Sequence, residues 1–251
     1  MKTGIFSAIL FLGGLAFGKT ITLNDDQKDD KNLISYFDFD TGAADTKNTI
    51  SWKESFTWNK AGQYGTASSG KAPYKESMMP NTAFTISFDL NRFTAGTLLT
   101  LTTASTDKEW RTVRLLTNDS GCLALTFGGT TKSTAITSAS LDWTTITLVG
   151  TASASDNNTL SLDLYANGVS QITLNVPKAT NWVSDKNITF QFGYFGNANN
   201  SSTFDVDNVL IYNKALSAVE INAITVPEPT TATLSLLALA GLAMRRRRKQ
   251  A

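Results

Sequence analysis

A strict alternation of apolar and polar side chains is the feature that most restricts the fold of this chain. Between Ala83 and Leu90, the residues Phe84, Ile86 and Phe88 alternate with threonine, serine and aspartate. Successive side chains of a β-strand point to opposite faces of its sheet, so the pattern places the large apolar groups on one face. The segment is therefore predicted to be a β-strand with one buried face.

Short runs with a strand-forming composition recur along the rest of the chain. A first strand is predicted at 33–40, and the poorly patterned stretch 41–80 is expected to hold one or two strands around 50–58. The further predicted strands are 97–102, 111–117, 122–127, 133–137, 143–150, 159–166, 169–174, 188–194 and 203–212. Asn167-Gly168 indicates a tight hairpin, because both turn positions need positive φ. Many strands without amphipathic helices between them favour an all-β sandwich or jelly roll.

One helix is predicted in the body, directly after the last strand. Ser217 and Glu220 have the spacing of a capping box. In that motif the serine hydroxyl accepts from a first-turn amide while the glutamate accepts from the serine N–H. The helix is therefore expected to begin immediately after Ser217.

The first 18 residues have the organisation of a secretory signal peptide. Met1-Lys2 supplies a positive start, and residues 5–17 form an apolar core. Ala16 and Gly18 fit the small-x-small cleavage site, which makes Lys19 the expected first residue of the mature chain. A structural strand or helix is the alternative interpretation of this stretch.

Near the other end, the uncharged residues 230–244 lie between a Pro-Glu-Pro triplet and a run of cations. As a helix this segment would be about 22 Å long, slightly short of a hydrocarbon core of about 30 Å. Arginine side chains that extend to the headgroups reduce the difference. We therefore expect a single transmembrane helix with its cationic end in the cytoplasm and the body outside. The alternative is a buried or amphipathic terminal helix, but only Ser235 is polar between Leu234 and Met244.

The whole tail, 226–251, resembles the PEP-CTERM sorting signal of Gram-negative bacteria. The matching residues are Pro227, Glu228 and Pro229 for the triplet and Arg245, Arg246, Arg247 and Arg248 for the basic end. The resemblance implies that the export machinery delivers the chain to the membrane, where an exosortase recognises and removes the tail. The body would then remain at the cell surface or in the extracellular matrix.

The net charge of the chain changes sign when its two ends are set aside. Residues 19–32 are polar and mostly acidic and are interpreted as a solvated lead-in to a domain at 33–225. Over 19–226 the net charge is about −4, against +1 for the whole sequence. A nucleic-acid partner is therefore not expected, because no basic surface remains. Cys122, the only cysteine, is interpreted as a small packed side chain in a strand.

The body, across 33–224, resembles laminin-G-like domains of the concanavalin A-like class. The similar segments are 84–88 for an early core strand, 143–149 and 164–168 for the central pair of strands, and 204–217 with Glu220-Ile221 for the closing segment. The resemblance implies a concanavalin A-like jelly-roll sandwich, a fold that often carries lectin sites. The chain departs from the family at Thr144 and Thr145, where a histidine commonly follows the central tryptophan.

The absence of histidine from the sequence restricts its catalytic chemistry. A Ser-His-Asp or Cys-His centre cannot be built, whereas glycoside hydrolysis needs only two carboxylic acids. Related glucanases carry their acids as Glu-x-Asp-x-x-Glu on one strand. The glutamates of the body form no such cluster; they are Glu54, Glu76, Glu109 and Glu220. The protein is therefore predicted not to be an enzyme, with a glycan-active enzyme as the alternative.

No cofactor is required by the sequence, and calcium is the inorganic ligand for which candidate residues exist. Asp38 and Asp40 on the first strand, and Asp205 and Asp207 on the last, would converge if those two strands pair, as the resemblance implies. We favour the alternative, in which Asp207 and Asn208 satisfy turn or strand-end amides and Asp38 faces solvent.

Aromatic side chains supply the candidates for sugar binding, because their faces stack on pyranose rings. Trp52, Trp58, Trp110 and Trp182 stand among polar residues and are either ligand platforms or structural anchors. Trp143 opens an apolar strand and is assigned to the core. Together these features predict an exported, non-catalytic β-sandwich that binds carbohydrate. The alternative is a structural matrix component without a small-molecule ligand, which the low charged fraction of 17% also fits.

Overall fold

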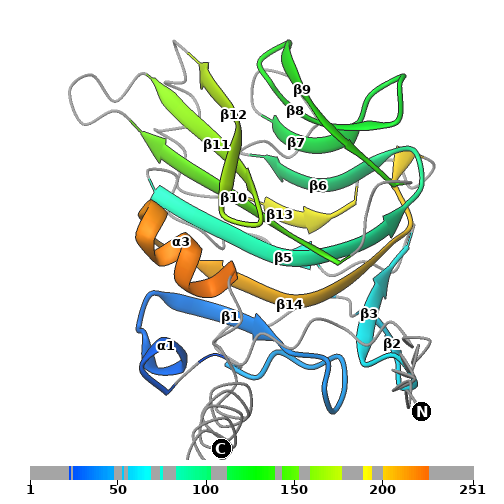
Figure 1. Cartoon of the computed structure of the whole chain (residues 1–251), viewed down its shortest axis with the longest axis vertical. Coiled ribbons are helices and arrows are strands. Elements are labelled where there is room, and N and C mark those ends of the chain that lie inside the picture. Colours follow the sequence, from blue (N-terminus) through cyan, green and yellow to red (C-terminus); the bar gives the residue numbers. More distant parts are fainter. Residues whose placement is uncertain are drawn as a thin grey trace, which may run out of the picture.

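A computed structural model of the chain contains two sheets of antiparallel strands packed face to face (Figure 1). It describes residues 23, 25–47, 53, 56–68, 74–75, 83–102, 112–138, 143–152, 159–176, 189–193 and 200–225. One sheet has eight strands and the other has six. The all-β sandwich expected from the alternating pattern is therefore confirmed.

The eight-stranded sheet joins strands from both ends and the centre of the body. Its strands are β1 (Leu33–Phe37), β2 (Thr57–Asn59), β3 (Tyr64–Ala67), β5 (Ala83–Phe93), β10 (Thr144–Ala152), β11 (Leu160–Ala166), β12 (Val169–Val176) and β14 (Phe204–Tyr212). Their order is β12-β11-β10-β5-β14-β3-β2. The second edge of β14 is shared, since β3 pairs with 204–206 and β1 pairs with 209–212.

The six-stranded sheet has the order β4-β13-β6-β7-β8-β9. Its strands are β4 (Tyr74–Lys75), β6 (Thr97–Thr102), β7 (Thr112–Thr117), β8 (Cys122–Phe127), β9 (Thr130–Thr137) and β13 (Thr189–Phe192). Each strand predicted from 84 onward is present in one of the two sheets, with bounds that differ by a few residues. Within 41–80 the chain forms β2, β3 and β4 in place of the one or two strands expected around 50–58.

Local signals predicted the hairpin and the helix correctly. Asn167 and Gly168, with φ values of 49° and 78°, form the turn between β11 and β12. Helix α3 (Ala218–Thr225) follows Ser217, whose N–H donates to Glu220 Oε2 at 2.7 Å. The Glu220 N–H in turn faces the Ser217 hydroxyl at 3.4 Å, which completes the capping box.

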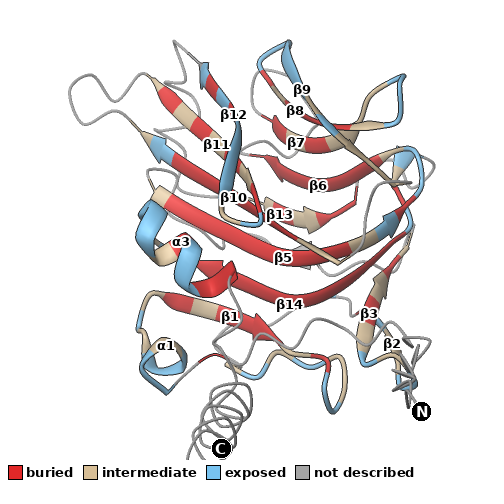
Figure 2. Cartoon of the chain, viewed as in Figure 1, coloured by how far each residue is buried: buried red, intermediate tan, exposed pale blue. Residues whose placement is uncertain are grey.

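Phenylalanine rings fill the space between the two sheets. Phe192 of β13 lies 5.9 Å from Phe88 of β5 and 6.2 Å from Phe204 of β14, measured between ring centroids, so it connects one sheet to the other. Phe56 lies 4.9 Å from Phe192 and adds a ring from the stretch before β2. Figure 2 shows the consequence, because β5, β6 and β14 are buried over most of their length. Burial of these rings, together with the aliphatic side chains of the same core, stabilises the sandwich.

A bulge in β14 allows both halves of that strand to direct apolar side chains into the core. Asn208 has a φ of 48°, and the pairing of β14 with β5 shifts between Asp207 and Leu210. Val206 and Val209 consequently both enter the core between the sheets, although their spacing of three would place them on opposite faces of a regular strand. Asp207 and Leu210 both point to the outer face.

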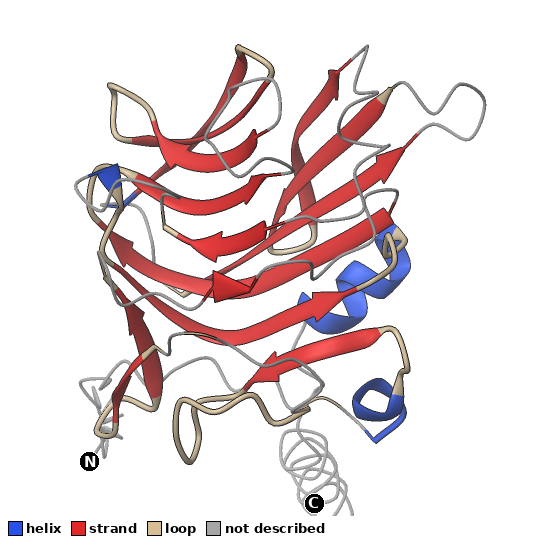
Figure 3. Cartoon of the chain, turned by 180° about the vertical axis from the view of Figure 1, so that it is seen from behind, coloured by secondary structure: helices blue, strands red, loops and turns tan. Residues whose placement is uncertain are grey.

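Part of the outer face of the eight-stranded sheet is covered by α3, which lies across its strands in Figure 1. A second apolar cluster forms there; its members are Leu23, Leu33, Tyr36, Val149, Leu210, Tyr212, Leu216, Ile221 and Ile224. The acidic lead-in was not expected to be helical, yet it forms the short helix α1 (Asp25–Asp29). Leu23, just before α1, is only 1% exposed. Seen from behind, α1 and α3 lie on the same side of the molecule, with α1 below α3 (Figure 3).

Several predictions from the sequence fall on residues outside the described part of the chain. They are the signal peptide 1–18 with Ala16 and Gly18, the sorting signal 226–251 with its Pro-Glu-Pro triplet and arginines, and the predicted transmembrane helix. Among the helices that the structure does describe, none combines the length and apolar character needed to cross a membrane. The signal peptide and the transmembrane helix stay predictions.

Candidate functional site

Beyond α3, the outer face of the eight-stranded sheet gathers polar and charged side chains from β5, β10 and β14, and most of them are buried. Asp89 of β5 is fully buried and accepts hydrogen bonds from the hydroxyl of Thr145 and from Asn208 Nδ2, the latter at 3.0 Å. Asp207 of β14 is its register partner on the neighbouring strand. Two carboxyl groups therefore lie side by side at the bulge.

Asp207 is an unusual carboxyl group. Its side chain is 3% exposed, and its Oδ1 accepts the N–H of Asn208 at 2.8 Å. Burial raises its pKa to about 8, and the negative charges of Asp89, Asp40 and Asp38 act in the same direction. Asp207 is therefore protonated at neutral pH.

The predicted meeting of four aspartates is only partly observed. β1 does pair with β14, which brings Asp38 and Asp40 near enough to Asp207 to influence its pKa. Asp205 is engaged elsewhere, because it accepts from Arg92 Nε at 2.9 Å and from the Thr66 hydroxyl at 2.8 Å. Asp38 is half-buried and Asp40 is exposed. Within the described ranges, no group of three or more histidine, cysteine, aspartate or glutamate side chains is arranged to hold a metal ion.

An aromatic pair crosses the outer face beside Asp205. The rings of Tyr64 on β3 and Trp143 before β10 lie 5.7 Å apart and are tilted by 58°. Strands β5 and β14 separate β3 from β10, a distance of about 14 Å at normal strand spacing. The two side chains therefore meet above the intervening strands. Both residues are half-buried.

Polar groups hold the tyrosine of this aromatic pair in place. The Tyr64 hydroxyl accepts from Asn59 Nδ2 at 2.7 Å and from Arg92 Nη2 at 3.3 Å. Arg92 also contacts Asp205 with Nη2 at 2.5 Å, although its side chain is 69% exposed. The hydrogen bonds and negative charge of Asp205 raise the pKa of Arg92 above its usual value. We name Asn59, Tyr64, Arg92, Trp143 and Asp205 the aromatic patch.

Of the four tryptophans expected from the sequence, the structure describes only Trp58, which is not part of the aromatic patch. Trp58 is half-buried, packs against the central core and donates its indole N–H to the Phe39 carbonyl at 2.9 Å, which makes it a structural anchor. Trp52, Trp110 and Trp182 lie outside the described residues. The assignment of Trp143 to the core was wrong, because its position just before β10 places it on the outer face. Cys122, expected to be packed, is half-buried at the start of β8.

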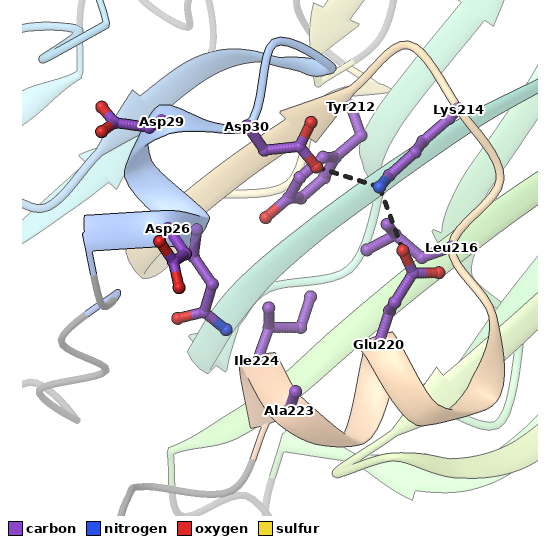
Figure 4. A pocket seen from close by; sticks show the side chains of 10 residues that line it. Asp26, Asp29, Asp30, Tyr212, Lys214, Leu216, Glu220, Ala223 and Ile224 are labelled. Carbon is purple, nitrogen blue, oxygen red and sulfur yellow. Dashed lines mark hydrogen bonds and ion pairs between the residues drawn. The ribbon is translucent and has the colours of Figure 1, made fainter.

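A separate pocket of about 500 Å³ lies between α1 and α3 (Figure 4). Its lining residues are Asp26, Gln27, Asp29, Asp30, Tyr212, Lys214, Leu216, Glu220, Ala223 and Ile224. The ammonium group of Lys214 bridges Asp30 at 2.9 Å and Glu220 at 3.0 Å. Burial lowers the pKa of Lys214, but the two carboxylates outweigh burial and the pKa lies above its usual value. We name this cavity the α1–α3 pocket.

Sequence reasoning missed the residues that lie closest together on the outer face. Asp89 is an acidic residue at a polar position of a strongly alternating strand. This position can be recognised in the sequence, but no sequence pattern indicates which residues Asp89 contacts. Tyr64 and Arg92 lie in stretches whose strand order had not been assigned. No sequence signal linked Tyr212 to α1, because the second apolar cluster forms only when the helices reach the sheet.

Comparison with protein families gives two matches. The laminin G family of the concanavalin A-like lectin/glucanases superfamily matches residues 59–222. The PEP-CTERM protein-sorting motif matches residues 225–249, which indicates an exported protein that an exosortase processes. No curated protein is similar to this chain in sequence.

Several solved structures share the fold at low sequence identity. Domain 4 of an extracellular arabinanase from Geobacillus stearothermophilus, in complex with arabinotriose, has a TM-score of 0.53 and 13% identity over 78% of this chain and 98% of that domain. The sialidase of Trypanosoma rangeli has a TM-score of 0.54 and 14% identity over 79% of this chain and 33% of its own. Botulinum neurotoxin type C, whose cell entry depends on two ganglioside molecules, has a TM-score of 0.50 and 15% identity over 77% of this chain and 50% of its own. Identities this low show the shared sandwich fold alone.

Proposed function

Because this chain belongs to the concanavalin A-like lectin/glucanases superfamily, we propose that it is an exported, non-catalytic carbohydrate-binding protein displayed outside the cytoplasm. The aromatic patch is its binding site. The observation that carries this assignment is the pair of half-buried aromatic residues, Tyr64 and Trp143, beside Arg92 and Asp205. The sugar-bound arabinanase domain of similar fold supports the ligand class.

The chemistry of the patch suits a saccharide. Aromatic rings stack on the C–H faces of sugar rings, and the Tyr64 ring is preorganised here by the hydrogen bonds to its hydroxyl. The exposed guanidinium of Arg92 donates hydrogen bonds to hydroxyl or carboxylate oxygens. Apolar stacking combined with a few fixed polar groups is typical of small-ligand sites.

The absence of catalysis is part of the proposal. Glycoside hydrolysis requires two carboxyl groups that flank a bound glycosidic bond. Asp89 and Asp207 are adjacent but are 0% and 3% exposed, and Asp89 already accepts two hydrogen bonds. Glu220, the one body glutamate in the described ranges, is held by the capping box and Lys214. These contacts support a binding role.

The route to the surface follows from the two ends of the chain. We infer that the signal peptide directs export, that residues 230–244 hold the protein in the membrane, and that the exosortase then releases the body. The match of residues 225–249 to the sorting motif supports this order of events.

A glycan array that includes arabinotriose tests the carbohydrate assignment. The full chain, purified in a mild detergent, should give a saturable signal that weakens about tenfold or more when Tyr64→Ala or Trp143→Ala removes a stacking ring, a loss of about 1.4 kcal/mol. Trp58→Phe is the matched control, because Trp58 is an aromatic anchor outside the patch. It should leave sugar affinity unchanged.

The structural-matrix alternative predicts a different result in the same experiment. A matrix component would fractionate with exopolysaccharide or surface material yet give no saturable signal with any glycan. Equal losses for Trp58→Phe and Trp143→Ala would place the effect in the stability of the fold and reject the aromatic patch as the binding site.

A further inference from the structure

The α1–α3 pocket has a charge distribution that the carbohydrate proposal does not use. We propose that it binds an organic cation, a primary amine or guanidinium on an apolar stem, of the kind that a lysine or arginine side chain of a partner supplies. The assignment does not depend on the proposed function, because the aromatic patch is built from other residues.

The pocket has more acidic groups than its own cation can neutralise. Lys214 is already bound by Asp30 and Glu220, at 2.9 Å and 3.0 Å. Asp26 and Asp29 of α1 are exposed and enter no ion pair within the described part of the chain. Four carboxylates against one ammonium leave the lining net negative, so the pocket attracts cations and repels anions.

The hydroxyl of a buried tyrosine opens into the same space. Tyr212 is 3% exposed and lines the pocket, and Figure 4 shows its hydroxyl directed toward the α1 side, near Asp26. No hydrogen bond reaches this hydroxyl from any residue that the structure describes. Burial and the charges of Asp30 and Glu220 raise the pKa of Tyr212, so the group stays neutral. Because this hydroxyl opens into the pocket and has no partner among the described residues, its oxygen can accept a hydrogen bond from a ligand donor.

The opposite wall of the pocket is apolar. Leu216 in the connection between β14 and α3, together with Ala223 and Ile224 of α3, faces the acidic side of the pocket (Figure 4). Methylene groups of a lysine or arginine stem would pack on this wall while the charged head reaches Asp26 and the Tyr212 oxygen. A volume of about 500 Å³ is within the range of small-ligand sites.

The test compares two probes, Nα-acetyl-lysinamide and its uncharged isostere Nα-acetyl-norleucinamide. Each probe is titrated into the full chain in mild detergent, and its binding is measured by saturation-transfer NMR. The lysine probe should bind about tenfold or more tightly than the norleucine probe, because only the lysine head can pair with Asp26 and the Tyr212 oxygen. Equal binding of the two probes, or no binding of the lysine probe, would overturn the proposal.

Three variants distinguish binding of the lysine probe in the pocket from general electrostatic attraction to the acidic helix. Asp26→Asn and Tyr212→Phe should each weaken the lysine probe by about fivefold or more, since each removes one polar contact. Asp25→Asn is the matched control, because it removes the same charge from the same helix at a residue that does not line the pocket. Its effect should stay below about twofold. Melting temperatures of all three variants would show that the fold is retained, and equal losses for Asp25→Asn and Asp26→Asn would overturn the pocket assignment.

Discussion

At the scale of single residues, the most informative group is the carboxyl group of Asp207. Its pKa in the folded chain is about 8, whereas an unburied aspartate titrates near 3.8. Between these values the folded state holds a proton that the unfolded chain has released. Stability must therefore fall as the pH rises through this interval, and the slope approaches about 1.4 kcal/mol per pH unit for one proton.

Asp207→Asn should remove this pH dependence. Asparagine keeps an oxygen that can accept the Asn208 N–H but cannot ionise. The variant should match the wild type near pH 4 and become increasingly more stable than it toward pH 8, as measured by urea unfolding across that range. Asp119→Asn, at an exposed turn, provides the control. Parallel pH profiles for wild type and Asp207→Asn would contradict the assigned proton.

Gly150 offers a steric prediction at the same scale. This residue of β10 pairs with Phe84 of β5, and an added Cβ would overlap the Phe84 ring. Gly150→Ala should therefore cost about 1–3 kcal/mol through overpacking. Gly42→Ala is the control, because a Cβ there meets no atom within 4 Å. Thermal unfolding should show a clear decrease in melting temperature only for Gly150→Ala.

At the scale of secondary-structure elements, α3 depends on the contacts at its first turn. Glu220 accepts from the Ser217 N–H and hydroxyl and pairs with Lys214, and these contacts hold its pKa below the usual value. Glu220→Ala should lower stability by about 1 kcal/mol, the usual cost of losing a cap. Glu220→Gln keeps an acceptor and should cost less. Val219→Ala, at a side chain 79% exposed, should be neutral in the same chemical-denaturation measurement.

The bulge in β14 shows that the alternation of side chains along a strand does not always specify which face of the sheet each residue occupies. A strand with uninterrupted alternation would place Val206 and Val209 on opposite faces. Asn208 adopts positive φ, which asparagine tolerates better than most residues, and both valines reach the core. The same bulge places Asp207 beside Asp89, so the unusual carboxyl group is a consequence of how the strand is kept in register.

At the scale of the whole molecule, the expected signal peptide and the sorting motif lead to a prediction about how the protein is processed. If the sorting signal acts as its motif indicates, protein recovered from the surface of the producing cell should begin at Lys19 and should lack Arg245 to Arg248. Intact mass measurement of the recovered protein checks both ends at once. A Glu228→Ala variant should retain its tail. Recovery of a cytosolic chain with both ends present would contradict export and processing.

The sequence alone was sufficient for features that depend on neighbouring residues. Alternation predicted the strands from 84 onward, Asn167-Gly168 predicted the hairpin, and Ser217 with Glu220 predicted the start of α3. The sorting motif is equally local, because it is a contiguous run of residues. Each of these signals acts over a few residues, so no knowledge of the fold is needed to interpret them.

The candidate sites were decided by the tertiary structure. Tyr64 and Trp143 are far apart in the chain and meet because strand order places β3 and β10 on either side of β5 and β14. Asp89 and Asp207 meet through register and a bulge, and Tyr212 reaches α1 through the packing of two helices on the sheet. Strand order, register and helix docking are set by burial of apolar surface across the whole molecule, and a linear sequence pattern does not specify which distant polar groups this burial brings together.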